Sequence, residues 1–312
     1  MSGPGNTFRA FGEEARRQAL IADIRNKGPI YTAWLTRASI EGDISAISAE
    51  HGLHPALARL LPALGAFGEA EDARSFYEAL LNAIPVGAET GELARQTLLL
   101  AWTDPVYGRA RMVAPGPVRD ACEGVVALVK QSVEQAVDKK AWRSARATLA
   151  AVRHDDPAAE KATDLVMSLG WDLDQAPGAA HDVISAWAAA VNLEADASDE
   201  DCFTAEESAT FETEMNKVNE EAMDSLAQGQ SVESIGVDDF LAEVEKLWRA
   251  DPVRHALRQR SVARRERSNA KVAAWRGSIQ RRMLDLAHAT LAAATMAIHP
   301  AEPVGLHDRQ QL

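Results

Sequence analysis

A run of cations is the part of this sequence best suited to binding chemistry. Residues 255–282 read HALRQRSVARRERSNAKVAAWRGSIQRR and contain eight arginines and one lysine, but a single acidic residue, Glu266. A guanidinium group donates paired hydrogen bonds to a carboxylate or a phosphate, so the stretch suits an acidic protein surface or a nucleic acid. The whole chain has a formal net charge of −13, which argues against a protein that coats nucleic acid with its entire surface.

The acidic residues gather immediately before these cations. Residues 194–245 contain seventeen Asp or Glu residues and one basic residue, Lys217, whereas residues 246–282 contain twelve Lys or Arg residues and two acids. Two adjacent blocks of opposite charge favour electrostatic pairing, either within one chain or between two copies.

The cationic segment is too polar to be buried in a core on its own. Between Arg258 and Lys271 the only large apolar side chain is Val262, and the cations lie at all angles around a helical wheel. Three hypotheses follow: neutralisation by the acidic block of the same or a second chain, simple solvation, and contact with nucleic-acid phosphates. The residues expected to contact an acidic partner or nucleic acid are Arg258, Arg260, Arg264, Arg265, Arg267 and Lys271.

A second candidate site is the stretch 42–64, which resembles a helix-turn-helix unit. Such a unit needs two short helices that are joined by a tight turn and locked together by apolar residues, and Gly52 occupies the turn position. The competing interpretation is an ordinary structural hairpin, which is favoured by Ser48 at a position where alanine is usual and by Pro62 in the second helix. If the unit reads DNA, the residues that face the bases are His54, Ala56 and Arg59.

Two His-Asp dipeptides form a third candidate site. Adjacent His and Asp on a helix can hold a divalent metal, and AAHDVISA around His181 and Asp182 resembles the motif of HD-type phosphohydrolases. This resemblance implies a helical, metal-dependent phosphohydrolase. The other dipeptide begins with His154 at a predicted helix end, where a histidine and a capping Asp are ordinary. Because no further Asp ligand is singled out by its spacing, we expect no metal and no cofactor.

The composition predicts that helices position all of these residues. Aromatic residues make up 5% of the chain and β-branched runs are almost absent, which is typical of an all-α fold built from helical bundles. Helix start signals agree, for example Pro117 in a first helical turn. The predicted helices before the charged region lie near residues 9–26, 29–38, 43–51, 55–64, 70–84, 89–103, 117–137, 139–154, 156–171 and 177–193.

The charged C-terminal region is expected to hold an acidic helix at about 204–228, a connector and a long basic helix. Thr204 and Glu207 have the spacing of a capping box, in which each side chain accepts a hydrogen bond from the backbone N–H of the other residue. The spacing of apolar residues after Thr204 fits a helix with one apolar face.

The long basic helix is predicted at about 252–298. Asp251 and Pro252 supply its cap and first residue, and no further proline follows until residue 300. Its cations at 254–282 dominate the first part, and only from Val272 onward does an apolar stripe return that can dock on the rest of the protein.

These elements suggest three domains and a function in binding. The expected domains are an N-terminal helical domain at 1–113, a helical-hairpin bundle at 114–193 and a charged region at 194–312. The residues at the start of the sequence do not fit a signal peptide, and the two cysteines are far apart, so we expect a cytoplasmic protein without a membrane partner.

The charged helices lead us to expect a non-enzymatic binding or regulatory protein that acts through protein–protein contacts or self-association. The alternatives are a DNA-associated protein that uses the hairpin at 42–64 and the basic helix at 254–282, and a metal-dependent phosphohydrolase.

Overall fold

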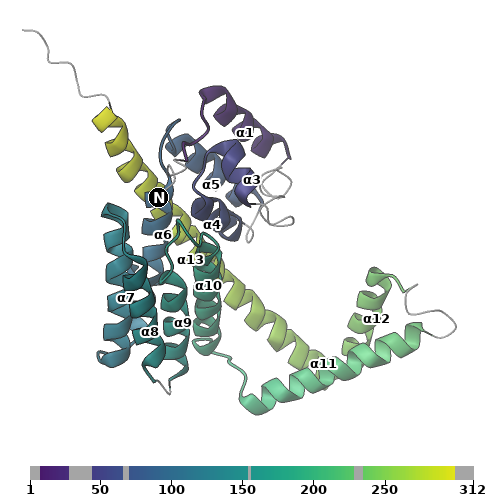
Figure 1. Cartoon of the computed structure of the whole chain (residues 1–312). Coiled ribbons are helices and arrows are strands. Elements are labelled where there is room, and N and C mark those ends of the chain that lie inside the picture. Colours follow the sequence, from purple (N-terminus) through teal and green to yellow (C-terminus); the bar gives the residue numbers. More distant parts are fainter. Residues whose placement is uncertain (1–7, 28–43, 66–69, 154–155, 228–234, 299–312) are drawn as a thin grey trace, which may run out of the picture. The chain divides into compact units, whose positions relative to one another are not determined.

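A computed structural model of the chain describes residues 8–27, 44–65, 70–153, 156–227 and 235–298 (Figure 1). These residues form twelve α-helices and a short 3-10 helix but no β-strand, so the all-α prediction is confirmed. None of the helices described is both long enough and apolar enough to cross a lipid bilayer. The helix predicted at 29–38 lies outside the described residues.

The chain divides into two compact units. Unit 1 contains residues 1–190 and 273–312, and unit 2 contains residues 191–272. The helices of unit 1 are α1 (Glu14–Lys27), α3 (Ile44–His51), α4 (Pro55–Gly65), α5 (Ala70–Ala83), α6 (Gly91–Thr103), η2 (Arg109–Met112), α7 (Pro117–Glu134), α8 (Lys139–Ala151), α9 (Pro157–Leu169), most of α10 (Ala179–Ala197) and the second part of α13 (Pro252–Ile298). Helices α6 and α7, which flank the domain boundary expected at residue 113, pack against each other within this unit.

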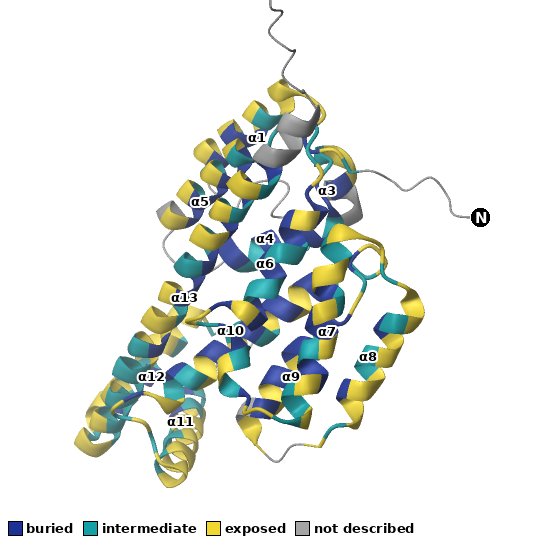
Figure 2. Ribbon diagram, turned by 90° about the vertical axis from the view of Figure 1, so that its left-hand side faces the viewer, coloured by how far each residue is buried: buried dark blue, intermediate teal, exposed yellow. Residues whose placement is uncertain are grey.

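Helix α4 is a core helix of unit 1. It packs against α3, α5 and α6, and seven of its residues are buried, namely Ala56, Leu57, Ala58, Leu60, Leu61, Leu64 and Gly65. The Tyr77 hydroxyl of α5 donates a hydrogen bond of 2.6 Å to the Leu61 carbonyl oxygen. Figure 2 shows α4 almost entirely buried, whereas α8 buries one side and exposes the other.

The second part of α13 also contributes to the core of unit 1. Its buried apolar residues among those described recur at spacings of four: Trp275, Ile279, Met283, Ala287 and Leu291. The Trp275 ring meets the Trp187 ring of α10 edge to face, with their centroids 5.3 Å apart. The apolar stripe predicted after Val272 is therefore confirmed.

Unit 2 is built from the end of α10, α11 (Ala205–Leu226), α12 (Val237–Ala250) and the first part of α13. Helices α11 and α12 pack against each other around four buried residues, Val218, Ala222, Val244 and Trp248. The Phe211 ring stacks on Trp248 with a centroid distance of 5.8 Å. Helix α12 occupies most of the segment between the acidic and basic helices, which was expected to be a connector, so that part of the prediction is wrong.

Local capping chemistry explains where several helices begin. Pro117 is in the first turn of α7, and Thr204 and Glu207 form both hydrogen bonds of the predicted capping box of α11. Asp251 accepts hydrogen bonds of 2.8 and 3.2 Å from the backbone N–H groups of Val253 and Arg254 at the start of α13. These start signals are confirmed.

Candidate functional site

The cations in the first part of α13 lie on two faces of that helix, so the expectation that they lie at all angles around it is wrong. One face carries Arg254, Arg258 and Arg265, which are separated by four and seven residues. The other face carries four cations at spacings of four, three and four residues, which we call the cationic stripe: Arg260, Arg264, Arg267 and Lys271.

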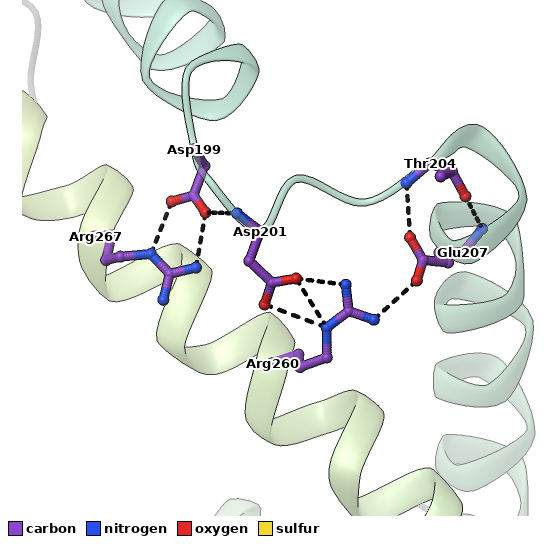
Figure 3. A network of polar contacts seen from close by, with 6 residues as sticks. All are labelled: Asp199, Asp201, Thr204, Glu207, Arg260 and Arg267. Carbon is purple, nitrogen blue, oxygen red and sulfur yellow. Dashed lines mark hydrogen bonds and ion pairs between the residues drawn. The ribbon is translucent and has the colours of Figure 1, made fainter.

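Arg260 binds two carboxylates at once (Figure 3). Its Nε and Nη2 donate hydrogen bonds to Asp201 Oδ1 at 3.1 and 2.6 Å, and its Nη1 donates to Glu207 Oε1 at 2.8 Å. The other Glu207 oxygen accepts a hydrogen bond of 2.9 Å from the backbone N–H of Thr204. The capping box of α11 therefore also orients the carboxylate that receives Arg260.

Asp199 receives the next arginine of the stripe. Arg267 donates from Nε and Nη2 to the two carboxylate oxygens of Asp199, at 2.8 and 2.7 Å. The backbone N–H of Asp201 donates a further hydrogen bond of 2.9 Å to Asp199 Oδ1. Only 2% of the Asp199 side chain is exposed, so this bidentate pair is shielded from water on the carboxylate side.

The two other cations of the stripe contact the same part of the chain. Arg264 Nη2 lies 3.7 Å from Asp196 Oδ2, and its guanidinium carbon lies 5.4 Å from the centre of the Phe203 ring. Lys271 Nζ donates a hydrogen bond of 3.1 Å to the Ala195 carbonyl oxygen. Residues 195–207, which we call the acidic cover, thus engage the whole cationic stripe.

The second face of α13 pairs with the α11–α12 hairpin. Arg254 Nε lies 2.7 Å from Glu214 Oε2, and its Nη1 lies 3.3 Å from Glu221 Oε2. Arg258 Nη2 donates a hydrogen bond of 2.9 Å to Glu245 Oε2 on α12. Arg265 differs from these cations because it is exposed and has no ion pair with another described residue.

Of the six cations predicted as contact residues, five are therefore engaged by groups of their own unit, and Arg265 is free among the described residues. The composition indicates the acidic block as a whole as their partner and does not single out Asp199, Asp201 or Glu207. The regular spacing of the stripe is a signal in the sequence that marks one helical face as the site of contact.

The ion pairs shift the pKa values of both partners. Hydrogen bonds from Arg267 hold the pKa of Asp199 well below its usual range, and hydrogen bonds from Arg260 lower the pKa of Asp201 and of Glu207. The same contacts with Asp201 and Glu207 raise the pKa of Arg260. All of these groups are therefore charged at neutral pH.

These pKa directions predict that unit 2 loses stability in acid. A carboxylate whose pKa is lower in the folded than in the unfolded chain contributes stability above the unfolded value, about 4, and that contribution disappears as the pH falls through the folded value. We expect the urea midpoint of the wild-type chain, followed by far-UV circular dichroism, to fall steadily below about pH 5.

The control for this prediction is the triple variant Asp199→Asn, Asp201→Asn, Glu207→Gln. It lacks three of the carboxylates whose pKa the ion pairs lower, so its midpoint should be lower at pH 7 and should change less in acid. Equal acid sensitivity of the variant and the wild type would contradict the assignment of acid sensitivity to these pairs.

The structure places the helix-turn-helix-like stretch against the core of unit 1. Helices α3 and α4 form and are joined at Gly52, but His54 and Ala56 are buried, so neither side chain faces a surface where bases could bind. Arg59 is half-buried on α4. Helix α4 is occupied by core packing along most of its surface, which supports the structural-hairpin interpretation of this stretch.

His54 instead caps α4 and binds an aspartate. The backbone N–H of Ala56 donates to His54 Nδ1 at 3.2 Å, which leaves the Nε2–H to donate to Asp174 Oδ1 at 2.9 Å. Arg95 also binds Asp174. These side chains line a cavity of about 460 Å³ in unit 1, to which Arg9 also contributes. Both ring nitrogens of His54 are therefore engaged in hydrogen bonds within unit 1.

The predicted metal residues do not gather into a cluster. His181 and Asp182 are exposed on α10, and the His181 Nε2 forms a hydrogen bond of 3.3 Å with Ser185 Oγ one turn along the same helix. No group of three or more His, Cys, Asp or Glu side chains among the described residues is arranged to hold a metal ion. His154 lies outside the described residues.

Comparisons with known protein families, with curated proteins and with solved structures find no match to this chain. The chemistry of its own side chains therefore has to support any functional proposal.

Proposed function

We propose that this protein is a binding or regulatory protein that acts through charged helical surfaces in protein–protein contacts, and that the acidic outer face of unit 2 is the surface it uses. The partner implied by this surface is a protein segment that presents arginine or lysine side chains. Paired charges across such an interface give specificity and a fast rate of association.

The proposal rests on one observation: unit 2 has an excess of acidic over basic residues, and most of its cations are already paired. Residues 191–272 contain nineteen acidic and ten basic residues, and most of the cations of α13 are already bound to groups of the same unit. Several carboxylates of α11 have no ion pair with another described residue and are exposed. An incoming partner therefore meets an excess of free negative charge.

Three of these carboxylates share one side of α11, namely Glu206, Glu220 and Asp224. Helical spacing places them opposite Val218 and Ala222, the residues that α11 buries against α12. We call these three residues the acidic face. The first turn of α12 adds two more exposed acids, Asp238 and Asp239.

A basic helical peptide tests the proposal. The probe is a fluorescent Ala-Arg peptide with arginines four residues apart, and its affinity for the full chain is measured by anisotropy at increasing salt. Replacing the acidic face with Glu206→Gln, Glu220→Gln and Asp224→Asn should weaken binding about tenfold at low salt, since each exposed pair contributes about 0.5 kcal/mol.

The matched control removes the same number of negative charges, but from unit 1. It replaces three exposed acids that have no ion pair with another described residue, namely Asp120, Glu134 and Glu160. This control should bind the peptide like the wild type. If the two triple variants lose the same affinity, the peptide reads only the total charge of the chain, and the acidic face is not the binding surface.

A further inference from the structure

The cationic stripe has the form of a binding surface that is already filled. Its four cations run along one side of α13 over about 16 Å, at 1.5 Å per residue. Each of them is met by an oxygen of the acidic cover, and two of the arginines use bidentate geometry (Figure 3). Guanidinium groups bind phosphate with the same paired geometry that they use for carboxylate.

The acidic cover touches the apolar core of unit 2 at Phe203, whose ring meets the Phe211 ring edge to face with centroids 6.1 Å apart. The four buried residues of that core come from α11 and α12, and none belongs to the cover or to the stripe. The turn that carries Asp199 and Asp201 is not helical, and Cys202 between the two helices is exposed. The contacts that hold this turn on α13 are mainly electrostatic, so a competing polyanion or high salt weakens them directly.

We propose that the cationic stripe is a binding surface for a phosphate polyanion, and that the acidic cover occupies it by presenting carboxylates where the phosphates would bind. In the covered state the chain has little affinity for nucleic acid, in keeping with its negative net charge. Displacement of the cover exposes four cations on one helical face. The stripe and the acidic face share no residue; Glu206 belongs to both the acidic face and the acidic cover, but it forms no ion pair with a described cation of the stripe.

The test compares the wild type with an uncovered variant, Asp199→Asn, Asp201→Asn, Glu207→Gln, in the full chain. The probe is a short fluorescent duplex DNA, and binding is measured by anisotropy over a range of salt concentrations. We expect the uncovered variant to bind at least tenfold tighter at low salt. Its plot of log affinity against log salt should be steeper by about three to four, because each phosphate contact contributes about 0.9.

Two further variants identify the cations responsible. Adding Arg260→Ala and Arg264→Ala to the uncovered variant should abolish the gain, because both belong to the stripe. Adding Arg265→Ala instead should leave most of the gain, because Arg265 is exposed on the other face of α13. A gain that survives the loss of Arg260 and Arg264 would overturn the proposal.

Single substitutions keep the test decisive if the uncovered variant does not fold. Asp201→Asn and Glu207→Gln each leave Arg260 with one carboxylate partner, and circular dichroism establishes that the helices persist. Each should give a smaller gain in DNA affinity of the same sign. If folded single variants bind DNA no more tightly than the wild type, the stripe is a structural ion-pair network and the proposal fails.

Long-chain inorganic polyphosphate serves as the second probe. Tighter binding of duplex DNA than of polyphosphate, at equal phosphate concentration, assigns the stripe to nucleic acid. The reverse order assigns it to polyphosphate. Absence of a gain for both probes in folded variants rejects a polyanion surface of either kind.

Discussion

Replacing Trp248 with alanine should destabilise unit 2 by about 3–5 kcal/mol, the range expected when a buried Trp is truncated. Trp248 is fully buried and is the largest of only four buried residues in the core that joins α11 to α12. Its removal takes away the surface on which Phe211 stacks. We expect amide hydrogen exchange in α11 and α12 to accelerate strongly, while the helices of unit 1 retain their protection.

Leu241→Ala provides the control on the same helix. The Leu241 side chain is 56% exposed, so its truncation should change the stability of unit 2 by no more than about 0.5 kcal/mol. Similar loss of protection in both variants would mean that the buried cluster around Trp248 does not hold the hairpin together.

Replacing Gly52 with alanine should destabilise unit 1 by about 2–5 kcal/mol. Gly52 has φ +64, a left-handed conformation that costs a residue with a side chain roughly 1–2 kcal/mol. A Cβ atom at this position would also lie 1.8 Å from the Arg9 carbonyl oxygen, so the backbone would have to move, at a further cost of about 1–3 kcal/mol. Urea unfolding of the full chain measures this loss.

Gly87→Ala separates the two contributions. Gly87 also has a positive φ, +80, but no atom lies within 4 Å of the position that its Cβ would take. This variant should show the conformational cost alone, about 1 kcal/mol. Equal destabilisation by the two substitutions would show that the close approach of Arg9 to Gly52 contributes nothing.

Gly52 also shows that a sequence pattern can predict local structure correctly without indicating what that structure does in the protein. The glycine turn between two short helices forms as predicted. Its conformation allows the chain before α1 to pass close by, and the backbone N–H of Phe11 donates a hydrogen bond of 2.7 Å to the His51 carbonyl oxygen. The close approach of the chain before α1 therefore explains why this position needs a glycine, and base recognition is not needed to explain it.

The parts of the fold that depend on residues close together in the sequence were predictable. Capping residues, prolines and apolar spacing predict most helices, including the long helix α13 through Gly277. The missed helix α12 has its own signal in Phe240, Val244 and Trp248, which are four residues apart and face the core cluster. The acidic residues around them make the segment resemble a solvated connector.

The partners of the cations were not predictable residue by residue. Asp199 and Arg267 are separated by 68 positions, and Asp201 and Arg260 by 59. The acidic block offers many chemically equivalent carboxylates, so composition cannot select among them. Which ones meet the cationic stripe depends on the turn after α10 and on the start of α11.

The sequence by itself determined the all-α class, the start of each capped helix, the two blocks of opposite charge and the return of an apolar stripe after Val272, because these depend on residues close together in the chain. Only the tertiary structure decided that His54 is buried against Asp174, that Arg260 and Arg267 are bound to carboxylates, and that Arg265 is exposed. Which residues of two distant segments form a pair depends on where tertiary packing places the two backbones. Helical periodicity alone does not contain that information.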